Sequence, residues 1–185
     1  MSFQIKTIIL ACLLIGIRLA NSSAQTNPRI AYELEFSTYL GGQSYDDGLF
    51  MEIDSLGCIY LSGNTSSTDF PTTPGAYRRT MYNSQTTDLF ITKMKADGSD
   101  LVYSTFFGGP GYDGHDYFVE IDEKQQFYVA GVTNSVNFPT TADAYDRSYN
   151  AGERDCFIMA MNAEGTGPVY STFMAIIKQS LSPAL

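Results

Sequence analysis

Short apolar runs separated by polar turns cover most of the chain and predict β-strands. Two successive segments each hold four runs rich in Ile, Val, Phe and Tyr, bounded by Gly, Asp, Ser and Asn. That composition is typical of short strands joined by tight turns. We therefore expect an all-β protein, with strands at 49–54, 58–64, 88–95 and 101–107 in the first segment and at 117–122, 126–133, 155–162 and 168–173 in the second.

The central strands are apolar at consecutive positions, without the alternation of a half-exposed sheet. Ile59-Tyr-Leu61 corresponds to Phe127-Tyr-Val129, and Leu89-Phe-Ile91 corresponds to Cys156-Phe-Ile158. A sheet with one solvated face would alternate apolar and polar residues, so both faces of these sheets should be covered. Four-stranded antiparallel sheets stacked face to face are the blades of a β-propeller. A β-sandwich is the alternative, but it predicts neither two-sided burial nor a repeat.

The two segments are copies of one unit, offset by 67 to 68 residues. Phe70-Pro-Thr-Thr-Pro-Gly-Ala-Tyr77 returns as Phe138-Pro-Thr-Thr-Ala-Asp-Ala-Tyr145, and Asp88-Leu-Phe-Ile91 returns as Asp155-Cys-Phe-Ile158. A fixed period indicates units that bury their faces by stacking on one another. We expect blade 1 at about 48–107 and blade 2 at about 116–173.

One further copy of the fourth strand precedes blade 1. Glu35-Phe-Ser-Thr-Tyr-Leu-Gly-Gly42 matches Val102-Tyr-Ser-Thr-Phe-Phe-Gly-Gly109, so Ala31 to Leu40 is expected to be an N-terminal orphan strand. Propellers typically have about 4 to 8 blades, and two blades with one strand cannot close a ring. We expect an incomplete propeller, whether a truncated product, a fragment, or a protomer that closes by association. Truncation is the favoured interpretation, because residues 175–185 abandon the repeat.

The first 24 residues have the pattern of a signal peptide, which leaves 25–174 as the repeat segment. Lys6 is followed by the apolar stretch 7–17, and Ser22-Ser-Ala24 provides small residues before the cleavage point. A weak lipobox ending at Cys12 leaves lipidation as an alternative. The apolar run is too short for a membrane span of about 20 residues. We expect an exported protein, located in the periplasm, at the cell surface or outside the cell.

The combined motifs resemble the bacterial SBBP-type beta-propeller repeat. The matching residues are Glu52-Ile-Asp-x-x-Gly-x-Ile-Tyr-x-x-Gly63, then Thr65-Ser-Ser-Thr-Asp-Phe-Pro-Thr-Thr73, then Tyr103-Ser-Thr-x-x-Gly-Gly109. The resemblance covers nearly all of residues 36–173. It implies an exported or cell-surface protein whose family shares no catalytic residues.

The charge of the chain argues against nucleic-acid partners. The formal net charge is −9 at pH 7, and nine basic against twenty acidic residues remain after the signal peptide. Such an acidic surface repels phosphate backbones.

Cys58 and Cys156 occupy non-equivalent repeat positions, which favours free, strand-buried thiols over a disulfide.

Four aspartates in the inter-blade loops are the candidate residues of a ligand face: Asp46, Asp47, Asp113 and Asp116. Close carboxylates can hold calcium, but the spacing is not an EF-hand. A turn-forming, solvated role is favoured, and no metal or cofactor is expected.

Two glutamates raise the question of catalysis. Glu52 and Glu120 recur on the strand expected nearest the propeller axis, where they could act as acid and base or could line a wet channel. His115 is the only histidine, which gives a histidine-based triad little support. No catalytic residue is therefore predicted.

The long loops after the second and fourth strands should share one side of the propeller, where binding residues commonly lie. Their repeated Phe and Tyr residues, Phe70, Tyr77, Phe138 and Tyr145, are expected to anchor the loops by packing. We therefore expect a non-enzymatic surface scaffold or binding module for a protein or glycan. A carbohydrate-active enzyme using carboxylates on the loop-rich face is the alternative.

Overall fold

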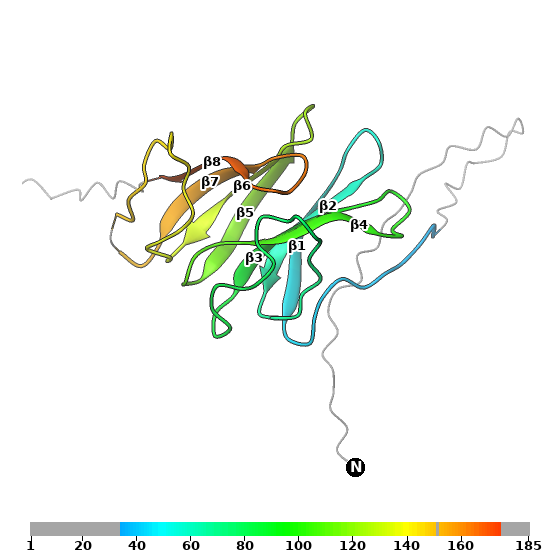
Figure 1. The fold of residues 1–185 in the computed structure, drawn as a ribbon, viewed down its shortest axis with the longest axis horizontal. Helices are drawn as coiled ribbons and strands as arrows, with labels where there is room; N and C mark the ends of the chain where they lie inside the picture. Colours follow the sequence, from blue (N-terminus) through cyan, green and yellow to red (C-terminus); the bar gives the residue numbers. More distant parts are fainter. Residues whose placement is uncertain (1–33, 151, 175–185) are drawn as a thin grey trace, which may run out of the picture.

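The computed structural model describes residues 34–150 and 152–174. This part of the chain contains eight β-strands and no helix (Figure 1). The strands are β1 (Asp46–Ile53), β2 (Ile59–Thr65), β3 (Asp88–Met94), β4 (Leu101–Phe107), β5 (Asp113–Ile121), β6 (Phe127–Thr133), β7 (Asp155–Met161) and β8 (Pro168–Met174).

Each repeat forms one antiparallel sheet with its strands in chain order. The first sheet has the order β1-β2-β3-β4 and the second has β5-β6-β7-β8, so each sheet is a simple meander. The two sheets stack without closing into a barrel (Figure 1). The predicted all-β propeller-repeat fold with two four-stranded blades is confirmed. The predicted signal peptide, 1–24, and the tail, 175–185, lie outside the described residues.

The first strand of each blade begins earlier than predicted. β1 starts at Asp46, paired with Thr65, and β5 starts at Asp113, paired with Thr133. The register shifts between Gly48 and Phe50 in β1 and at two points before Phe118 in β5. Such bulges insert residues that break the side-chain alternation of the strand. This explains why the Gly- and Asp-rich starts of these strands looked like loops.

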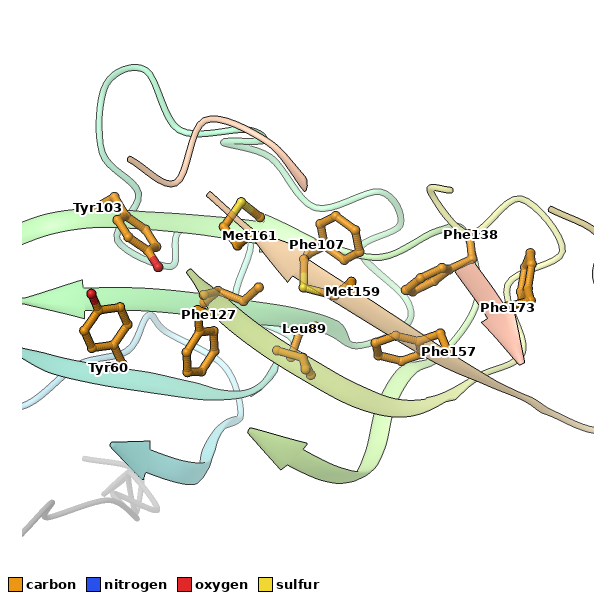
Figure 2. Close-up of a cluster of buried hydrophobic side chains, with 12 residues drawn as sticks. Tyr60, Leu89, Tyr103, Phe107, Phe127, Phe138, Phe157, Met159, Met161 and Phe173 are labelled. Carbon is orange, nitrogen blue, oxygen red and sulfur yellow. The ribbon is translucent and has the colours of Figure 1, made fainter. Parts of the chain in front are cut away.

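A shared apolar core joins the two blades (Figure 2). The first blade contributes Leu89, Ile91 and Phe107, which are fully buried beside Phe127 and Phe157 of the second. The rings of Tyr60 and Phe127 stack across the interface with centroids 5.7 Å apart. The expected two-sided burial is present in the first blade. Stacking thus removes from water the apolar surface that a single sheet would expose.

A second core lies on the opposite face of the first blade. It is built on Ile59, Leu61, Phe90, Met94 and Phe106. Phe70, from the loop after β2, stacks on Phe90 with centroids 4.5 Å apart. Phe36 and Leu40 pack against the same cluster.

The predicted orphan strand, Ala31 to Leu40, forms no strand over its described part, residues 34–40. The reason is that a fourth strand needs a third strand beside it, and no described strand pairs with this segment. Its side chains nevertheless keep their place in the repeat. A Cβ atom on Gly98 would lie 2.3 Å from the Phe36 ring, and one on Gly165 would lie 2.4 Å from the Tyr103 ring.

Candidate functional site

Asp46 anchors the segment that leads into the first blade. Its Oδ2 accepts hydrogen bonds from the backbone N–H of Gly42, at 2.8 Å, and from the Ser67 hydroxyl, at 2.9 Å. Its Oδ1 accepts from the Thr65 hydroxyl at 2.5 Å. This carboxylate ties the incoming chain to the end of β2 and to the loop that follows.

Asp113 repeats this arrangement at the joint between the blades. Its Oδ2 accepts from the backbone N–H of Gly109 at 2.6 Å and from Ser135 Oγ at 2.9 Å, and its Oδ1 accepts from Thr133 Oγ1 at 2.5 Å. The side chain is fully buried. Burial raises the pKa of Asp113, and the three hydrogen bonds oppose that rise. Asp46 and Asp113 are therefore structural acceptors at equivalent joints, and the predicted solvated role is wrong for Asp113, because its side chain is fully buried.

The other two candidate aspartates do not join these clusters. Asp47 is half-buried and accepts a hydrogen bond from the Tyr45 hydroxyl at 2.9 Å. Because Asp46 and Asp47 are successive residues of β1, their side chains lie on opposite faces of the sheet. Asp116 lies in β5, but its side chain is outside the described residues, as is that of His115. Among the described side chains, no group of three or more His, Cys, Asp or Glu could hold a metal ion.

Glu52 and Glu120 occupy the same register in the two blades. Glu52 pairs with Tyr60 and Glu120 pairs with Tyr128, and both glutamates are exposed. Their strands, β1 and β5, lie against each other. Equivalent, solvated carboxylates suit an acidic lining. An acid–base pair instead needs environments that separate the two pKa values.

A buried ion pair at the start of β3 escaped the sequence interpretation. Asp88 Oδ2 accepts from Arg78 Nη2 at 3.1 Å and from the backbone N–H of Tyr82 at 3.0 Å. The carboxyl group is fully buried, and burial raises its pKa to about 6. The signal was present, because Asp88 and Asp155 open the third strand in both repeats. Each aspartate was interpreted only as the first residue of an apolar strand.

A second buried ion pair lies within the first blade, and its lysine also donates a hydrogen bond to the second blade. Lys93, only 4% exposed, places Nζ 3.5 Å from Asp54 Oδ2 and donates to Gln125 Oε1 at 2.7 Å. The ammonium group also lies 4.9 Å from the centroid of the Tyr60 ring. Lys93 stands within an apolar strand, and its repeat counterpart is Ala160, so repeat symmetry gave no sign of this contact.

The long loops are fastened to the outer strands. The backbone N–H of Thr73 donates to the carbonyl of Ser104 at 3.1 Å, and Thr141 donates in the same way to Ser171 at 2.9 Å. Phe70 and Phe138 are buried, which confirms their predicted packing role. The prediction fails for Tyr145, because no described segment covers that ring.

Comparison with known proteins gave no match, either among protein-family models or among curated proteins. Within the described residues, no helix has the length and apolar character needed to cross a membrane.

Cys58 and Cys156 are both free and partly buried within their blades, so no disulfide joins them. The thiols are free, as predicted, but the strand-buried position is wrong, because neither thiol is fully buried and Cys58 lies just before β2.

Proposed function

We propose that this chain is an exported β-propeller segment of the SBBP-type repeat family, acting as a surface scaffold or binding module without catalysis. One observation carries the proposal. Recurring side chains serve the fold: Asp46 and Asp113 hold equivalent joints through hydrogen bonds, and Phe70 and Phe138 are buried. A repeated motif that specifies blade geometry supports a scaffold role. The binding residues are then those that differ between the two repeats.

The loop after β2 offers a surface suited to a ligand. Tyr82 is mostly exposed, and the Arg78 guanidinium lies 5.7 Å from the centroid of its ring. Arg78 is replaced by Asp146 in the second repeat, so this pair belongs to one blade alone. An exposed aromatic ring beside an arginine can stack on a sugar or contact a peptide. A protein or glycan is therefore the proposed class of ligand.

Binding is tested by screening the purified protein against glycan and protein arrays. The Tyr82→Ala variant should lose binding at least about tenfold, whereas Tyr39→Ala, which removes another exposed ring, should keep it. Binding unchanged by Tyr82→Ala would contradict a ligand surface on this loop.

Export is tested separately, by expressing the full chain in a bacterium and sequencing the N-terminus of the protein outside the cytoplasm. Cleavage after Ala24 is expected, and a chain retained in the cytoplasm with Met1 intact would contradict export.

The enzymatic alternative rests on Glu52 and Glu120, which are exposed on neighbouring strands. Glu52→Gln and Glu120→Gln should each leave array binding unchanged and abolish no activity. Glycan hydrolysis that either substitution reduced a hundredfold would instead establish the enzyme.

A further inference from the structure

The far face of the second blade lacks the cover that the first blade receives. In the first blade, Leu89 and Phe107 are fully buried against the second blade. Their counterparts on β7 and β8 are Cys156, which is partly exposed, and Met174, which is 39% exposed. Ile158, the counterpart of buried Ile91, is 37% exposed. We call this surface the trailing face; it comprises Val132, Cys156, Ile158, Tyr170 and Met174, with Tyr145 at its edge.

Tyr145 shows the same missing contact in the loop. Its counterpart Tyr77 packs on Phe107 and donates its backbone N–H to the carbonyl of Gly165, in the next blade, at 2.9 Å. Tyr145 is 81% exposed, and its N–H turns back to the hydroxyl of Tyr170 within its own blade. The second blade thus presents the same docking residues as the first, without a described blade to receive them.

The surface that would receive them is present on the first blade. We call it the leading face; it comprises Ile59, Leu61, Phe90, Met94 and Phe106. By strand register these residues correspond to Phe127, Val129, Phe157, Met161 and Phe173, which seat the second blade on the first. The leading face therefore corresponds to the surface by which the second blade packs on the first. The trailing face corresponds to the surface of the first blade that receives it.

Residues 36–40 lie over the leading face, whose five residues are each at most 6% exposed. Phe36 and Leu40 contact it, while Leu34, before the segment, and Tyr39, within it, are mostly exposed. The segment forms no strand ladder. In the repeat, Phe36 and Leu40 correspond to Tyr170 and Met174 of the trailing face. The segment thus fills the place that β8 of another blade would take.

We propose that a second copy of this chain docks its leading face on the trailing face of the first, head to tail, displacing residues 36–40 from the leading face. Continuity with the interface inside the chain selects a second copy as the occupant, since each copy carries both surfaces. The contact is heterologous, so it propagates until the ring closes. With the two described blades per copy, a propeller of about 4 to 8 blades closes with about two to four copies.

The association is measured by sedimentation velocity of the full chain over a range of concentrations. Ile158→Asp should shift the protein to monomer, because it places a charge in the contact. Val136→Asp is the matched control, because Val136 is a more exposed apolar residue whose repeat counterpart, Thr68, is also exposed. Tyr145→Asp repeats the test at a side chain that contributes little to the fold of one copy.

The displaced segment gives a test of opposite sign. Phe36→Ser loosens the cover of the leading face and should lower the midpoint concentration of association about tenfold, which corresponds to about 1.4 kcal/mol. A wild-type chain and a Phe36→Ser chain that both stay monomeric would overturn the proposal. Association that neither Ile158→Asp nor Tyr145→Asp weakens would overturn it as well.

Cys156 reports on the same contact without a substitution. Its labelling by a maleimide, followed at each cysteine by peptide mass spectrometry, should slow as the protein concentration rises. Cys58 packs at the edge of the internal core and should label at a constant rate. Equal concentration dependence at both thiols would contradict docking on the trailing face.

Discussion

The ring of Tyr103 lies so close to Gly165 that a Cβ atom on the glycine would approach it to 2.4 Å. Tyr103 belongs to β4 of the first blade, and Gly165 lies in the turn between β7 and β8 of the second. This contact sets how closely one end of the second blade can approach the first.

Gly165→Ala should therefore destabilise the protein more than strain in the backbone alone would. Gly165 has a φ of 68°, where a side chain costs about 1 to 2 kcal/mol, and the clash with Tyr103 adds about 1 to 3 kcal/mol. Gly75→Ala is the matched control, since Gly75 has a φ of 84° with no atom within 4 Å of the added Cβ. Denaturant unfolding measures both variants. Equal losses would show that the contact with Tyr103 adds nothing.

The buried carboxylate at the joint between the blades gives a second prediction. Asp113→Asn replaces one acceptor oxygen with a donor, which leaves one of its hydrogen-bond donors without an acceptor. A loss of about 1 to 3 kcal/mol in the free energy of unfolding is expected. Asp47→Asn, at a half-buried position accepting from Tyr45, should change stability by less than about 0.5 kcal/mol. An Asp113→Asn variant as stable as wild type would contradict the structural role.

Asp88 should make stability depend on pH. Its pKa rises from 3.8 to about 6 on folding, because burial penalises the carboxylate. The folded state therefore binds this proton more tightly than the unfolded state does. The contribution of the protonated Asp88 to the free energy of unfolding is fully present below about pH 4 and is lost as pH rises through about 6. The loss should be on the order of 2 to 3 kcal/mol.

Asp88→Asn should flatten that part of the stability–pH curve. The control is Asp97→Asn, because hydrogen bonding by Ser99 lowers the pKa of the exposed Asp97 and confines its effect to more acidic pH. Urea unfolding at intervals from pH 3.5 to 7 measures both. A wild-type curve and an Asp88→Asn curve of equal slope between pH 4 and 6 would contradict the assignment.

The buried lysine gives a prediction that separates two kinds of ion pair. Lys93→Met removes the cation beside Asp54 and should cost about 3 kcal/mol, because a buried carboxylate is left without a cation and keeps only the hydrogen bonds from the backbone N–H groups of Leu56 and Cys58. Lys95→Met breaks the exposed pair with Asp100 and should cost no more than about 1 kcal/mol. Adding Asp54→Asn to Lys93→Met should restore part of the loss. Equal costs at Lys93 and Lys95 would contradict a buried pair.

The repeat made most of the fold predictable. Apolar residues on both faces of β2 and β3 indicated stacked sheets, and that stacking is present. The start of β1 at Asp46 was missed because a bulge near Gly48 breaks the alternation on which strand prediction rests. The orphan strand was placed correctly in the repeat, but a sequence motif cannot supply the hydrogen-bonding neighbour that a strand requires.

The site was less predictable than the fold. Asp46 and Asp113 stood out by their repetition, and repetition marked a structural joint. Lys93 could not be found from the sequence, because it interrupts an apolar strand in one repeat and pairs with residues distant along the chain. Tyr145 illustrates the limit of symmetry, since equal residues in two repeats differ in exposure when only one of them has a neighbouring blade.

Stacking of the two repeats through one core is tested most directly by nuclear Overhauser effects between aromatic rings. In the monomeric Ile158→Asp variant with selectively labelled Tyr and Phe, cross-peaks should connect Tyr60 with Phe127, whose ring centroids are 5.7 Å apart. Phe107 and Phe138, at 5.5 Å, should give a second connection between the blades. Contacts within each sheet together with none between Tyr60 and Phe127 would show that the repeats fold without stacking and would contradict the propeller arrangement.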